Sequence, residues 1–172
     1  MLERRRIADL MLPTGEITLG FPGTPLINVP SDVRPAVPPG AYPTFLSAAR
    51  QPSGYKTFAY LSVRFSDEPV RKWSPAGRFF TDSGTGCVVD RSLEAIVRDR
   101  SFAELQQAKN GVYEGGDGSL LLDNETGANA IVFRTLDWEY ECFVGNDRLG
   151  RHAWLVVDGR YPRWWEPSAW WR

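Results

Sequence analysis

The clearest pattern in the chain is an alternation of side chains across residues 56–65. Alternate positions of this segment fall on opposite sides of an extended strand: Thr57, Ala59, Leu61, Val63 and Phe65 on one side, and Phe58, Tyr60, Ser62 and Arg64 on the other. Because apolar residues occur on both sides, the pattern predicts a central strand that is partly covered on both faces.

Four short apolar runs in the last third of the chain predict further strands, at residues 119–122, 130–135, 140–144 and 153–157. Turns rich in glycine, aspartate and asparagine separate them. Because each predicted strand follows the previous one after such a turn, we expect a β-meander.

The first 55 residues are rich in proline and glycine and hold only short apolar runs. Proline lacks a backbone donor and belongs at strand starts, edges and turns. We therefore expect short edge strands here, at residues 16–21 and 42–48, joined by ordered loops. Residues 70–74 predict another short strand, and residues 78–81 lead into a glycine-rich segment.

Helix signals are confined to the middle of the chain. Asp90 is placed to cap a first helical piece, and Ser101 and Glu104 have the spacing of a capping box, in which each side chain satisfies an amide near the other. These signals predict two short consecutive helices near residues 90–109, ending close to Gly111.

Together these elements predict a mainly β (α+β) fold, an antiparallel sheet or sandwich with two short helices. A length of 172 residues suits one domain with a substantial core, and no change of composition divides the chain. We expect a single domain over residues 1–172.

Composition narrows the environment and the partners. The net charge of -1 argues against a general nucleic-acid binder, which would need clustered Lys and Arg. The two cysteines, Cys87 and Cys142, fit neither a disulfide-dense scaffold nor a close-spaced metal knuckle. With no export signal and no long apolar run, we expect a cytoplasmic protein without membrane contact.

The segment at residues 82–87 is the most unusual local feature. Its residues are Asp82, Ser83, Gly84, Thr85, Gly86 and Cys87, and the two glycines let backbone amides approach a ligand closely. A structural turn is the other interpretation, and it is favoured because the P-loop lysine is missing and acids flank the segment. We expect Cys87 to be buried.

Catalytic and metal chemistry have few candidates. His152 is the sole histidine, and its spacing from Ser83 or Cys87 matches no familiar hydrolase signature. Loops containing Asp117, Asp123, Asn124 and Glu125 lack the ordered ligand spacing of a calcium site. We expect no catalytic residue, no metal and no cofactor.

Acidic residues are concentrated between Glu114 and Asp147, where eight acids accompany one basic residue, Arg134. On a strand, Asp137, Glu139 and Glu141 would share one side, where like charges repel unless solvent or a basic partner meets them. The sequence thus suggests an acidic docking face, with a solvated face as the alternative. Its expected residues are Asp137, Trp138, Glu139, Tyr140, Glu141 and Asp147.

Four of the seven tryptophans lie in the last nine residues, at positions 164, 165, 170 and 171. Such a tail invites association if it stays exposed. We expect it to dock on its own sheet or to form a homodimer or partner contact.

Several motifs resemble a bacterial family known as domain of unknown function 4241. The similar positions are Pro38, Pro39, Gly40, Tyr42, Pro43, Trp73, Asp82, Gly84, Gly86, Cys87 and Asp90. The resemblance spans roughly residues 10–160 and departs at residues 137–142, where the family tends to a glycine-rich turn. It implies a small bacterial cytosolic domain and carries no established activity.

The leading hypothesis is a protein-binding domain, specifically an immunity-type inhibitor that presents the acidic stretch to a basic toxin. One alternative is a small enzyme or ligand sensor with its site at residues 82–87. Another is an oligomerising structural domain that uses the tryptophan-rich tail.

Overall fold

The computed structural model describes residues 2–20, 35–50, 56–81, 84–100, 102–114, 118–135 and 138–159. Within them the strands form two sheets, and every strand pairing is antiparallel. The six-stranded sheet has the order β1 (Leu2–Leu12), β3 (Gly40–Arg50), β4 (Lys56–Arg64), β10 (His152–Asp158), β9 (Trp138–Asn146), β5 (Lys72–Thr81). The four-stranded sheet has the order β2 (Ile17–Gly20), β6 (Thr85–Asp90), β8 (Asn129–Arg134), β7 (Ser119–Leu121).

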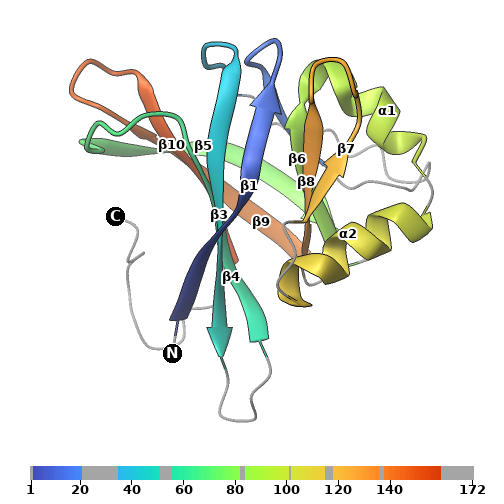
Figure 1. Cartoon of the computed structure of the whole chain (residues 1–172). Coiled ribbons are helices and arrows are strands. Elements are labelled where there is room, and N and C mark those ends of the chain that lie inside the picture. Colours follow the sequence, from blue (N-terminus) through green and yellow to red (C-terminus); the bar gives the residue numbers. More distant parts are fainter. Residues whose placement is uncertain are drawn as a thin grey trace.

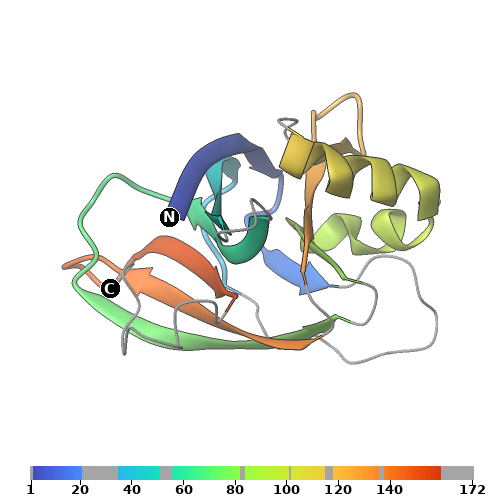
Figure 2. The same ribbon diagram turned by 90° about the horizontal axis from the view of Figure 1, so that it is seen from below.

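The elements stack in three layers (Figures 1 and 2). The four-stranded sheet lies between the other two layers. One of its faces packs against the six-stranded sheet, and the helices cover its opposite face. Between the sheets, the Phe133 ring stacks on Phe58 with centroids 5.4 Å apart. Between the small sheet and the helices, a second cluster joins Cys87 to Val97 and Leu105. The predicted mainly β, single-domain fold is confirmed.

The helices follow β6 directly. They are a 3-10 turn, η1 (Arg91–Leu93), then α1 (Glu94–Arg98) and α2 (Phe102–Glu114). Asp90 caps the first turn by accepting from the Ser92 amide, as predicted. The helix expected to end near Gly111 continues to Glu114. Ser101 lies outside the described residues, so the capping box stays a prediction.

The predicted central strand is confirmed, since β4 lies between β3 and β10. The side chains of β4 do not alternate regularly between the two faces of the sheet. The pairing with β3 skips Ala59, so that Tyr60 pairs with Ser47 and Phe58 pairs with Ala48. This bulge turns Phe58 to the core side, where Leu61 also lies.

The expectation of only short edge strands in the first 55 residues was wrong. β1 and β3 are both 11 residues long, and β3 lies inside the sheet. A shift in pairing between Arg6 and Ala8 breaks the alternation of β1, which hid it in the sequence. Pro43 fits within β3 because its pairing partner is Asp9 of β1, and the pairing of β3 with β4 begins one residue later.

The expected β-meander was also wrong. β7 and β8 belong to the small sheet, whereas β9 and β10 form a hairpin of the large sheet. The short strand expected at residues 70–74 and the lead segment at residues 78–81 belong to one strand, β5, with a register shift between Pro75 and Gly77. β5 is an edge strand of the large sheet.

One face of the large sheet is buried against the small sheet, and no described helix or strand packs over the opposite face (Figures 1 and 2). We call this opposite face the outer face. In the described part of the chain, no helix is long and apolar enough to cross a membrane.

Candidate functional site

The described part of the glycine-rich segment is a buried strand. Asp82 and Ser83 lie outside the described residues, whereas Thr85, Gly86 and Cys87 are buried in β6, between β2 and β8. Gly84 has a positive φ of 63°, and its carbonyl accepts from the Thr135 amide at 3.0 Å. These contacts favour the structural interpretation of the segment.

Gly86 is required by packing between the sheets. A Cβ built at this position would lie 2.8 Å from Cζ of Phe133, closer than real Cβ contacts. The absent side chain makes room for the ring, and a ligand is not needed to explain the glycine.

Cys87 is buried, as expected, and 3% exposed. Burial, with a smaller contribution from the charge of Glu94, raises the pKa of its thiol to about 12. The thiol is therefore protonated at neutral pH and unsuited to nucleophilic attack.

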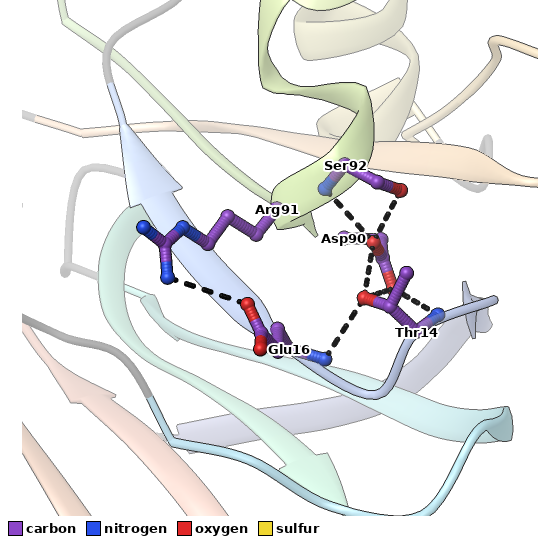
Figure 3. Close-up of polar contacts among 5 residues, drawn as sticks. All are labelled: Thr14, Glu16, Asp90, Arg91 and Ser92. Carbon is purple, nitrogen blue, oxygen red and sulfur yellow. Dashed lines mark hydrogen bonds and ion pairs between the residues drawn. The ribbon is translucent and has the colours of Figure 1, made fainter.

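Asp90, the acid that follows this segment, is fully buried and tied to a distant turn (Figure 3). It accepts from the backbone N and Oγ of Thr14, at 2.9 and 2.8 Å, and from the backbone N and Oγ of Ser92, at 3.0 and 2.7 Å. Burial acts to raise the pKa of its carboxyl, but these hydrogen bonds outweigh burial and lower the pKa.

Beside Asp90, Arg91 donates its backbone amide to the Glu16 carbonyl at 2.7 Å and forms an exposed ion pair with the Glu16 carboxylate (Figure 3). Together, Thr14, Glu16, Asp90, Arg91 and Ser92 join the β1–β2 turn to the start of the helices. Because donors already surround Asp90, we assign this group to the fold.

Two residues of the expected acidic face are buried. Tyr140 is 3% exposed and packs edge-on against Phe58. Asp147 accepts from the backbone amides of Leu149 and Arg151 and from Nε of Arg151 in the β9–β10 turn. Neither side chain is available to a partner, contrary to our expectation.

The hydrogen bonds at Asp147 also set its ionisation. Burial acts to raise the pKa of this carboxyl, but the donors on Arg151 and Leu149 outweigh it and lower the pKa. Asp147 therefore holds the hairpin turn as a carboxylate.

The remaining acids, Glu139 and Glu141, lie on the outer face of β9. Arg78 of the neighbouring strand β5 contacts both, with N–O distances of 3.5 Å to Glu139 and 3.6 Å to Glu141. The two carboxylates thus share one guanidinium. Asp137 and the side chain of Trp138 lie outside the described part of the chain.

Phe80 was not recognised in the sequence as a candidate binding residue. It pairs directly with Glu139 across β5 and β9, and 46% of it is exposed. The sequence signal was its place in residues 78–81, which were interpreted only as a lead into the glycine-rich segment. We call Phe80, Glu139 and Glu141 the acidic–aromatic site.

Metal chemistry gains no support in the described residues, where no group of three or more His, Cys, Asp or Glu side chains is arranged to hold an ion. Asp123 instead accepts from the Glu125 amide and the Thr126 hydroxyl within its own turn. Nδ1 of His152 lies 2.8 Å from Oδ1 of Asn146 in the neighbouring strand.

Comparison of the chain with protein-family models, with curated proteins and with solved structures found no match. The resemblance to domain of unknown function 4241 therefore stays a prediction. The arrangement itself offers an exposed ring beside two carboxylates, which is chemistry suited to recognising a basic, partly apolar protein surface.

Proposed function

We propose that this chain is a protein-binding domain that docks a basic partner at the acidic–aromatic site. The observation that carries the proposal is the exposure of Phe80 directly opposite Glu139. An aromatic ring that becomes desolvated supplies binding energy, and carboxylates around it select a basic partner.

Arg78 partly compensates the negative charge of this site. It keeps Glu139 and Glu141 side by side in the absence of a partner, and all three side chains remain accessible to solvent. An arginine or lysine of the partner can share the carboxylates with Arg78, because each carboxylate accepts several hydrogen bonds.

We further propose the specific role of an immunity-type inhibitor whose basic partner is a bacterial toxin. Such a partner matches the sign of the site, and rapid, charge-steered association suits an inhibitor that must act before its target does. The role rests on charge complementarity and on the expected bacterial, cytoplasmic setting.

The test uses the full chain as bait in lysate of the cells that produce it, followed by affinity measurement with the captured protein at low and high salt. The variant E139Q/E141Q should weaken binding by about tenfold and flatten its salt dependence. F80A should weaken binding at both salt concentrations, because it removes apolar contact area.

The matched control is E68Q/E125Q, which removes two exposed carboxylates from loops away from the site. Equal affinity of E139Q/E141Q and this control for the captured partner would sink the proposal. A captured partner with an acidic binding surface would exclude the toxin role.

A further inference from the structure

The outer face of the large sheet carries a second group of side chains, on strands β1, β3, β4 and β10. It consists of Arg4, Phe45, Arg64 and Trp154, which we call the arginine–aromatic cluster. Their neighbours along the strands, Leu46, Val63 and Leu155, face the core. The alternation of each strand therefore places the cluster on the opposite, outer face.

The guanidinium groups lie over the aromatic rings, and the two rings are tilted toward each other. Phe45 and Trp154 have centroids 6.1 Å apart. The guanidinium carbon of Arg4 lies 4.4 Å from the Phe45 centroid and 5.1 Å from the Trp154 centroid. Arg64 lies 5.7 Å from the Phe45 centroid. These cation–π contacts restrain both guanidinium groups, and the N–H groups that are not in an ion pair can donate to a ligand.

The charges of this cluster are poorly compensated. Arg4 has no ion pair with any carboxylate in the described residues, and its described contacts are with the two rings. Arg64 pairs at 3.1 Å with Asp67, whose side chain is 88% exposed and can move aside. Two guanidinium groups held against aromatic rings match a carboxylate-bearing ligand.

Two hydroxyls beside the cluster lack hydrogen bonds. Ser47 pairs with Arg4, and Ser62 pairs with Phe45, so both lie on the outer face. Each is at least 98% buried, and neither Oγ has a hydrogen-bond partner. Unpaired buried polar atoms are rare, and they cost stability unless a further group satisfies them.

We propose that the arginine–aromatic cluster is a docking site for an acidic segment of a partner protein. Carboxylates of the segment bind Arg4 and take the place of Asp67 at Arg64, and its apolar atoms cover Phe45 and Trp154. Nucleic acid fits less well, because the cluster supplies two guanidinium groups and the chain has a net charge of -1, whereas a phosphate backbone is bound by many clustered basic side chains.

The arginine–aromatic cluster and the acidic–aromatic site carry opposite charges and lie on different strands. The two proposals can therefore fail separately. The test measures fluorescence anisotropy of labelled hexaglutamate and hexalysine with the full chain at low salt. R4Q/R64Q should weaken hexaglutamate binding by about tenfold and leave hexalysine binding unchanged. E139Q/E141Q should not weaken hexaglutamate binding.

The matched control is R98Q/R148Q, which removes two exposed arginines outside the cluster and causes the same change in net charge. W154L keeps both charges and should still weaken hexaglutamate binding, because it removes one of the two rings that hold Arg4. In the unmodified chain, the indole N–H resonance of Trp154 should move when hexaglutamate is added.

Three results would overturn the proposal. The first is that R4Q/R64Q and the control bind hexaglutamate equally. The second is that hexaglutamate leaves the Trp154 resonance unmoved. The third is that a single-stranded DNA oligonucleotide binds the cluster more tightly than hexaglutamate, which would identify the ligand as nucleic acid.

Discussion

At the residue scale, Asp90 connects parts of the chain that are 76 positions apart. D90N should lower the free energy of unfolding by about 2–3 kcal/mol, because the amide cannot accept from all the donors on Thr14 and Ser92. Urea denaturation at pH 7 measures the loss. D99N, which changes an exposed carboxylate after α1, is the control and should change stability little.

The pKa of Asp90 also predicts a response to pH. Because the hydrogen bonds lower its pKa below the ordinary 3.8, the carboxylate stabilises the fold fully above that value. Its contribution is lost as the pH falls through the lower, folded-state pKa. The difference in stability between the unmodified chain and D90N should therefore shrink below about pH 3.8. A constant difference down to pH 2 would contradict this assignment.

Gly86 allows a second test at a single position. G86A should destabilise the protein by about 1–3 kcal/mol, because its Cβ must displace the Phe133 ring. G20A is the control, since a Cβ at Gly20 in the adjacent strand β2 meets nothing within 4 Å. Thermal unfolding of the two variants separates packing from the general effect of replacing a strand glycine. Equal melting temperatures would refute the packing role.

At the element scale, Asn129 joins the two sheets. Its side chain accepts from the Met11 amide at 2.9 Å and donates to the Asp9 carbonyl at 3.0 Å and to Ser119 Oγ at 2.6 Å. N129D keeps the acceptor but loses both donated bonds, so it should destabilise the protein by about 2 kcal/mol. N129L removes all three bonds and should also speed hydrogen exchange at Met11. Unchanged exchange there would show that β1 does not need this contact.

Helix α2 should tolerate a stabilising change. A Cβ at Gly111 meets nothing within 4 Å, and the helix continues to Glu114. G111A should raise the free energy of unfolding by about 0.5–1 kcal/mol, because glycine is a poor helix former. Chemical denaturation measures the gain. A loss of stability would mean that the backbone at Gly111 needs glycine.

Sequence patterns predicted elements better than they predicted pairing. β4, β8 and β10 were recognisable because their apolar runs are local. The assignment of β8 to the small sheet and β9 to the large sheet was hidden, because it depends on contacts with strands far away in the chain. β1 was hidden by its irregular register.

The candidate site shows the same limit. The sequence correctly placed Glu139 and Glu141 on one strand face, since a period of two requires only local backbone geometry. It could not show that Tyr140 and Asp147 turn inward, or that Arg78 and Phe80 lie beside the acids, because these facts depend on how β5 pairs with β9.

At the scale of the whole molecule, the two sheets share one core. F133L removes ring contacts from the middle of that core and should destabilise both sheets together, by about 1–3 kcal/mol. Slow-exchanging amides of β4 and β8 should lose protection equally. Lost protection confined to β8 would mean that the sheets unfold separately, in conflict with a single cooperative domain.

The irregular edge strand β5 has a consequence for the protein at high concentration. A straight edge strand of ten residues, with one side unpaired, would be a template on which another chain could add its own strand. Pro75 offers no N–H to such a chain, and the register shift before Gly77, with its φ of 120°, distorts the row of backbone groups. The same interruption that divided β5 in the sequence thus makes this edge of the sheet a poor template for polymerisation.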